Sequence, residues 1–132
     1  MTKKRMKKEL GKSIGAERMD SFNTGATRGN DDDKLDYEGF LSPIALKEYA
    51  TYCHKHRTQV DGKIRASDNW QLGIPIFRYM KSLWRHFMDV WIAYRKWDPT
   101  INIKESLCAT IFNAHGMLHE ILKAEMAEKG KG

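Results

Sequence analysis

The sequence contains few cysteines and no long apolar run, and both absences exclude classes of protein. Its two cysteines, Cys53 and Cys108, are too few for a disulfide framework and are typical of a reducing cytoplasm. Every apolar stretch is far shorter than the ~20 residues of a transmembrane helix, so no membrane contact is expected. The basic N-terminal segment lacks the apolar core of a secretory signal. With 132 residues, we expect a soluble, cytoplasmic protein of one domain.

Familiar catalytic signatures are also missing. The chain has no Walker loop and no GxGxxG, HExxH or GxSxG motif, so the chemistries that these motifs serve have no support. Cys53, His54 and His56 lie close together, but no second ligand pair at zinc spacing accompanies them. We interpret them as the cationic end of a helix rather than as a zinc site.

The net charge of +6 is concentrated at the N-terminus. Residues 1–20 contain seven Lys/Arg and three acids, and the rest of the chain is nearly balanced. Affinity for polyanions would therefore lie in a basic tail, and nucleic acid is not an expected partner. We interpret residues 1–21 as a flexible basic tail, and residues 22–132 as the single domain.

Three segments have helical patterns, and no convincing strand run, repeat or low-complexity tract appears. Ser42-Pro43 is a start signal for a helix to about residue 57. A second helix is predicted from Pro75 to about residue 96, and a third from Asn102 to about residue 127. The fold class is therefore all-α: a compact helical bundle of three to four main helices.

Apolar positions predict which helix faces form the core. In the second helix they occupy one wide arc, which predicts burial against more than one neighbour: Ile76, Tyr79, Met80, Leu83, Trp84, Phe87, Val90, Trp91 and Tyr94. In the third helix the predicted core face contains Ile103, Leu107, Ile111, Ala114, Met117, Leu118 and Ile121.

A polar stripe on the second helix is the first candidate site. Arg78, Ser82, Arg85 and Asp89 lie opposite the apolar arc, and His86 lies at its boundary. A solvated face with a weak Arg85–Asp89 pair explains this stripe without any function. Alternatively, the arginines bind phosphate and the carboxylate binds a divalent cation.

The third helix and the preceding loop offer further candidates. Glu105, Ala109, Asn113, Gly116 and Glu120 share one face of the third helix, where the small residues permit either tight packing or a ligand. Helix capping alone accounts for Glu105. In the long loop before the second helix, Asn69 and Trp70 are either an anchor for the loop or a base-reading element.

In their order along the chain, several motifs resemble a known family. These are FNTGATR (22–28), KLDYEGFLSP (34–43), NWQLGIP (69–75), the pair Arg85-His86, and then Glu105, Asn113 and His119. The combination, over about residues 22–122, is similar to a phage-borne family of dATP/dGTP diphosphohydrolases. That family is related to the MazG-like all-α nucleoside triphosphate pyrophosphatases.

The resemblance implies hydrolysis of a purine (deoxy)nucleoside triphosphate to monophosphate and pyrophosphate, in phage nucleotide-pool control. It implies Mg²⁺ or Mn²⁺ as cofactor, a homo-oligomer (dimer or tetramer), and the host cytoplasm as location. The expected catalytic residues are Arg85, His86, Asp89 and Glu105, and the expected metal ligands are Asp89, Glu105 and Glu38. The expected nucleotide-binding residues are Arg28, Lys34, Lys63, Asn69, Trp70, Arg78 and Asn113.

Two other functions remain open. The EExxE and ExxD carboxylate clusters of MazG-like enzymes are absent, so a phage protein that binds a nucleotide or nucleotide-derived signal without cleaving it, against host defence, is the main alternative. A small adaptor acting through its basic tail is the other.

Overall fold

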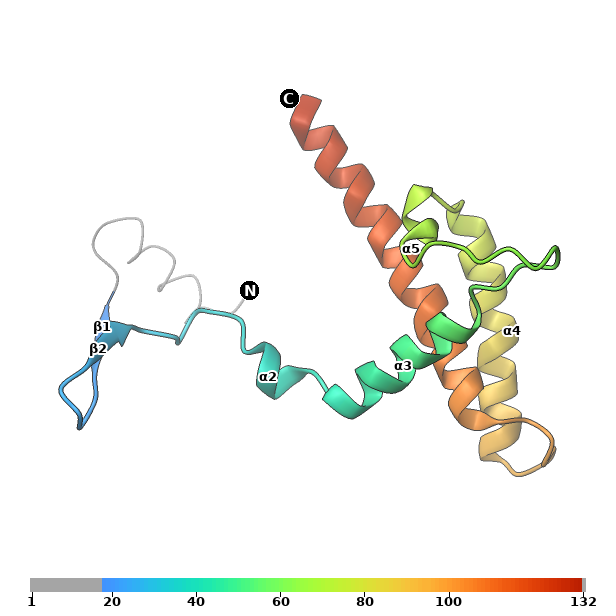
Figure 1. The fold of residues 1–132 in the computed structure, drawn as a ribbon, viewed down its shortest axis with the longest axis horizontal. Helices are drawn as coiled ribbons and strands as arrows, with labels where there is room; N and C mark the ends of the chain where they lie inside the picture. The colour runs from blue at the N-terminus through green and yellow to red at the C-terminus, as the bar shows by residue number, and fades with distance from the viewer. Residues whose placement is uncertain (1–17, 132) are drawn as a thin grey trace. The chain divides into compact units, whose positions relative to one another are not determined.

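A computed structural model of the chain describes residues 18–131. Helices dominate this part of the chain and confirm the all-α prediction (Figure 1). They are α2 (Tyr37–Phe40), α3 (Pro43–Lys55), the 3-10 helix η1 (Asn69–Leu72), α4 (Ile76–Tyr94) and α5 (Ile103–Lys131). Most of the predicted basic tail lies outside the described residues.

The chain divides into two units, and the second begins at Pro43. The described part of the first unit contains α2 and a hairpin of strands β1 (Met19–Ser21) and β2 (Thr27–Gly29), which pair antiparallel. The prediction of no strand was wrong here, because strands of three residues are too short to show an alternating pattern. At the hairpin tip, Gly25 has a φ of 91°, a backbone conformation that favours glycine.

The second unit is built on α4 and α5, which pack against each other as an antiparallel hairpin, while α3 packs against α5 (Figure 1). The predicted helix starts are confirmed within a residue or two. The side chain of Asn102 caps α5 by accepting hydrogen bonds from the backbone N–H groups of Lys104 (3.1 Å) and Glu105 (3.3 Å). None of the helices in the described part of the chain combines the length and apolarity of a membrane span.

The predicted core faces were largely wrong. The buried face of α5 is instead its stripe of small and polar residues: Ser106, Cys108, Ala109, Asn113 and Gly116. On α4 only Tyr79 is fully buried, at 2% exposed, whereas Trp84 is 61% exposed. Small residues let the backbones of packed helices approach closely, so α5 contacts its neighbours through this stripe. Its aliphatic stripe, including Leu107 and Leu118, stays exposed.

Candidate functional site

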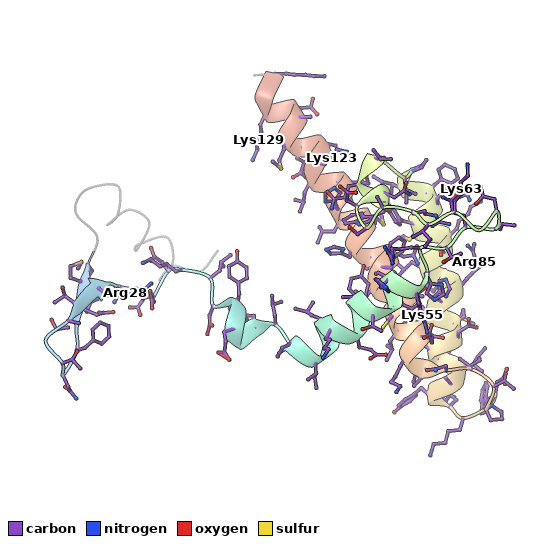
Figure 2. All side chains as sticks on the ribbon, in the orientation of Figure 1. Arg28, Lys55, Lys63, Arg85, Lys123 and Lys129 are labelled. Atoms are coloured by element: carbon purple, nitrogen blue, oxygen red, sulfur yellow. The ribbon has the colours of Figure 1, made fainter. Side chains whose placement is uncertain are left out.

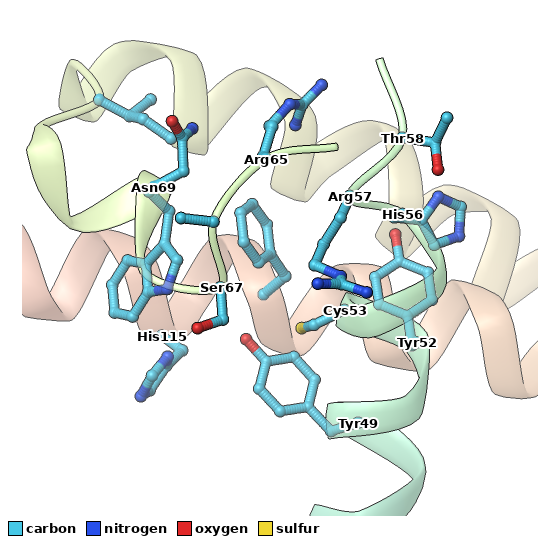
Figure 3. Close-up of a pocket in the computed structure, with 14 residues that line it drawn as sticks. Tyr49, Tyr52, Cys53, His56, Arg57, Thr58, Arg65, Ser67, Asn69 and His115 are labelled. Carbon is cyan, nitrogen blue, oxygen red and sulfur yellow. The ribbon is translucent and has the colours of Figure 1, made fainter. Parts of the chain in front are cut away.

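A pocket of about 470 Å³ lies in the second unit, where the end of α3, the following loop and η1 meet α5 (Figure 3). Ligand pockets are commonly about 300–1,000 Å³. Aromatic and basic side chains line it, and none of its fourteen lining residues is an acid. The lining residues are Tyr49, Tyr52, Cys53, His56, Arg57, Thr58, Arg65, Ala66, Ser67, Asn69, Trp70, Ile74, Phe112 and His115.

Arg57 is the best-anchored cation of the pocket. It follows the end of α3, and its Nε donates a hydrogen bond to the carbonyl oxygen of His54 (3.0 Å). One of its terminal nitrogens lies 3.2 Å from Nε2 of His54. A guanidinium has five N–H donors, so the remaining donors of this half-buried side chain can bind an anion bidentately. The second arginine, Arg65, is exposed, and its backbone N–H bonds the Arg57 carbonyl (2.9 Å), which joins the two ends of the loop.

Aromatic rings form the opposite side of the pocket. Trp70 of η1 lies with its ring centroid 5.4 Å from that of His115 and 4.7 Å from that of His119, both on α5. Tyr49 contacts His115 edge-on from α3, at a centroid distance of 6.0 Å. Trp70 is half-buried, so part of its indole surface is open to a planar ligand.

Burial keeps the α3 side of the pocket uncharged. Burial raises the pKa of the Tyr49 phenol, and a hydrogen bond with Cys53 adds to this effect. Burial also raises the pKa of the Cys53 thiol. Both groups are therefore neutral at physiological pH, and the fixed positive charge of the pocket comes from its arginines.

Glu105 lies just outside the pocket, at the start of α5. Its carboxylate bonds the Lys55 ammonium and lies 3.5 Å from Nε2 of His56, a lining residue. The hydrogen bond from Lys55 holds the pKa of Glu105 below its ordinary value, and His56 contributes to the same shift. Glu105 is thus an ionised group that ties α5 to the end of α3.

Two of the predicted nucleotide-binding residues, Asn69 and Trp70, line the pocket. Lys63 and Arg78 do not, and Figure 2 shows Lys63 on the loop after α3, with Arg85 on α4. Asn113 is buried and donates a hydrogen bond to the Ala109 carbonyl of its own helix (2.8 Å).

The predicted catalytic residues lie on α4 (Arg85, His86 and Asp89) and at the start of α5 (Glu105). His86 and Asp89 are half-buried on α4, and no ion pair joins Asp89 to the exposed Arg85. Gly116 of α5 lies against Tyr79 of α4. From that contact, the axial rise is about 15 Å to Asp89 along α4 and about 16.5 Å back to Glu105 along α5. Asp89 and Glu105 therefore lie at the same level of the hairpin.

The other predicted residues belong to the first unit. Arg28 lies on β2, Glu38 lies in α2, and Lys34 forms an ion pair with Asp31 (3.7 Å). Across residues 18–131, no group of three or more His, Cys, Asp or Glu side chains gathers where a metal could bind. The expected metal site on Asp89, Glu105 and Glu38 therefore stays a prediction.

Most of the pocket was missed at the level of the sequence, including Arg57, Arg65, His56 and His115. One feature of the sequence does indicate this pocket: a pair of arginines, Arg57 and Arg65, flanks the loop between residues 58 and 64. The antiparallel bridge Thr58–Ile64 closes this loop and brings both arginines to the pocket. A pairing of two single residues leaves no periodic pattern in the sequence.

Comparison of the chain with protein-family models, curated proteins and solved structures finds no match in any of the three. The resemblance to the dATP/dGTP diphosphohydrolases therefore stays a prediction.

Proposed function

We propose that this chain binds a purine nucleotide in the pocket between α3, η1 and α5, without needing a metal ion. The observation that carries the proposal is the composition of the pocket: two arginines beside a set of aromatic rings, with no acid in the lining. Arginines recognise phosphate oxygens in a bidentate manner, and aromatic rings stack on bases. An acid-free lining favours direct contact between phosphate and protein, because the lining itself contains no carboxylate to repel the phosphate or to hold a bridging cation.

The expected orientation follows from the positions of these groups. The phosphates lie toward Arg57, Arg65 and His56, and the base lies between Trp70 and His115, where the Asn69 amide can read its polar edge. In a phage, such a protein would sequester a nucleotide or nucleotide-derived signal. We also propose a cytoplasmic location, since Cys53 and Cys108 are both free thiols. Self-association, which the resemblance implies, remains part of the proposal.

Nucleotide binding to Arg57→Ala protein tests this function. Titration calorimetry with dGTP and dATP, in buffer containing EDTA, should show binding to the parent. Loss of a charge-assisted contact costs about 1.5–3 kcal/mol, which weakens binding about ten- to hundredfold. Lys63→Ala is the matched control, because Lys63 is a cation on the same loop outside the pocket lining, and it should bind like the parent. Equal affinity of Arg57→Ala and the parent, or no binding at all, would sink the proposal.

Hydrolysis of the bound nucleotide is the second candidate function. One observation favours it: Asp89 and Glu105 lie at the same level of the hairpin, and Glu105 contacts His56 of the pocket. Mg²⁺ or Mn²⁺ would supply Lewis-acid chemistry if this acid pair held it. Since the described residues bring together no larger ligand set, binding remains the function that the geometry supports better.

A further inference from the structure

The near balance of charge beyond the basic tail, which argues against a nucleic-acid partner, conceals a local excess of cations. Residues 54–96 contain nine Lys/Arg and three acids, whereas residues 21–53 contain three Lys/Arg and six acids. Residues 97–132 contain four Lys/Arg and five acids. The basic segment runs from the last turn of α3 to just past the end of α4, and all of it belongs to the second unit. The excess is therefore a property of the second unit and not of the tail.

Three of these cations form a stripe on α4, spaced three and four residues apart so that they share one face of the helix. All three are exposed, and none of them takes part in an ion pair with another described residue. We call this group the α4 basic stripe and define it by Arg78, Lys81 and Arg85.

The acids of the same segment oppose these cations only weakly. Asp61 accepts a hydrogen bond from the backbone N–H of Lys63 (3.0 Å) within the loop after α3, and Asp89 is half-buried. Asp68, just before η1, is the third. The stripe itself contains no acid, so its charge is available to an anionic partner.

The α4 basic stripe lies on the same side of the α4–α5 hairpin as the pocket. Tyr79 and Gly116 mark the directions in which the two helices face each other, because they are in contact. At about 100° per residue, Arg85 lies about 120° from Tyr79, against the rotation of the helix from its N- to its C-terminus. The pocket residues Phe112 and His115 lie about 40° and 100° from Gly116 in the same sense. Because α4 and α5 run antiparallel, equal senses of rotation point to the same side of the hairpin.

The stripe and the pocket also lie at the same level along the hairpin. Arg85 is about 9 Å along α4 from Tyr79, and Phe112 is about 6 Å back along α5 from Gly116. These two displacements have the same direction, since the helices are antiparallel. The cations of α4 therefore flank the pocket rather than one end of the hairpin.

The phosphate end of the pocket is more open than its base end. Arg65 and His56 are exposed, whereas Trp70 is half-buried and in ring contact with His115 and His119. A phosphate bound at the open end can therefore be esterified to a further nucleotide that lies outside the pocket. Figure 2 shows the additional cations Lys63 and Arg85 on this loop and on α4.

We propose that the pocket takes one unpaired nucleotide of a single-stranded nucleic acid, and that the α4 basic stripe binds the phosphates of the nucleotides that follow it. The inference rests on the proposed nucleotide pocket and names a polymer as its ligand. Proteins that bind single strands combine a basic track for the backbone with aromatic rings on which bases stack, and the second unit has both on one side. A duplex fits less well, because its paired and stacked bases are not available to the pocket.

Fluorescence anisotropy of the full chain with labelled oligo(dA) and oligo(rA) of about ten nucleotides, in buffer containing EDTA, tests the proposal. The parent should bind one of the two strands at least about tenfold more tightly than it binds dAMP, and excess dAMP should displace the strand from the pocket. On single strands each phosphate contact adds about 0.7 to the slope of log affinity against log salt. Lys81→Ala and Arg85→Ala should each flatten the slope by about 0.7, and should weaken strand binding about fivefold at ~0.1 M salt.

Lys129→Ala is the matched control for Lys81→Ala. It removes the same charge from an exposed helical lysine, about 20 Å along α5 from Gly116 and beyond the start of α4 (Figure 2). It should bind the strand with the parental slope. Titration calorimetry should show that Lys81→Ala binds dAMP like the parent, because Lys81 is not part of the pocket lining. The basic tail is the same in every variant, so differences between them report on α4.

Strand binding that is no tighter than dAMP binding overturns this proposal and leaves the nucleotide pocket standing. If neither the strand nor dAMP binds, both proposals fail. Parental slopes in Lys81→Ala and Arg85→Ala overturn it too, because the phosphates then contact the tail or another surface. Equal affinity for oligo(dA) and for its duplex with oligo(dT) would contradict the placement of an unpaired base in the pocket.

Discussion

Gly116 lies where α5 packs against the Tyr79 ring of α4, and the missing side chain is what makes the contact possible. A Cβ added at Gly116 would overlap the Tyr79 ring and lie 2.6 Å from its hydroxyl oxygen. Gly116→Ala should therefore lower the free energy of unfolding by about 1–3 kcal/mol, because the fully buried ring has no room to move. Urea denaturation followed by circular dichroism measures the change.

Gly130→Ala is the control for the backbone effect of the same substitution. It also lies in α5, but nothing lies within 4 Å of an added Cβ. Alanine is the better helix former by about 0.5–1 kcal/mol, so this variant should be as stable as the parent or slightly more stable. If Gly116→Ala behaved like Gly130→Ala, the close packing of α4 on α5 at Tyr79 would be wrong.

For single residues, sequence patterns predicted some structural roles correctly and others not at all. The small residues Ala109 and Gly116 were expected either to pack tightly or to leave space for a ligand, and their burial shows tight packing. Asn69 and Trp70 were singled out because they precede a helix in a long loop, and they line the pocket. The role of Arg57 is not predictable from the sequence, because it depends on closure of the loop by the Thr58–Ile64 bridge, which leaves no periodic pattern.

Among the elements, helix positions were predictable because their start signals are local. Ser42-Pro43 and Asn102 act through their own backbone neighbours, and α3 and α5 begin at Pro43 and Ile103. The buried faces were not predictable in the same way. Apolar periodicity shows that a face avoids water but not which partner covers it. In the described part of the chain, Leu107 and Leu118 on the aliphatic stripe of α5 are exposed.

The link between α3 and α5 gives a prediction about pH. The hydrogen bond from Lys55 lowers the pKa of Glu105 below 4.5, so the ionised form stabilises the fold above that pH. The stabilisation is lost as pH falls through the lowered pKa. Glu105→Gln should therefore have a lower urea midpoint than the parent at pH 7. The two midpoints should converge in acid, below the folded pKa of Glu105.

Glu125→Gln serves as the comparison, since Glu125 is an exposed acid on the same helix. The difference between its urea midpoint and that of the parent should not depend on the contact between Lys55 and Glu105. A Glu105→Gln defect of the same size at pH 7 and in acid would mean that the ion pair contributes nothing.

For the whole molecule, the pocket lies on the side of the α4–α5 hairpin where α3 and η1 contact α5. Periodicity in the sequence predicted the all-α class, but the position of the pocket depends on which helices contact each other. The two strands of the first unit were missed because short hairpins are specified by turn chemistry, here by Gly25.

The positions of the acids also lead to a test that distinguishes nucleotide binding from nucleotide hydrolysis. Full-length protein incubated with dGTP or dATP and Mn²⁺ should return the nucleotide intact after denaturation, as measured by anion-exchange chromatography, because the described acids form no metal-binding group of three. The Asp89→Asn and Glu105→Gln proteins should then bind nucleotide like the parent. Release of pyrophosphate by the parent, lost in both variants, would instead assign catalysis to this acid pair. Pyrophosphate release that both variants retain would trace to a contaminating enzyme or to other residues of the chain.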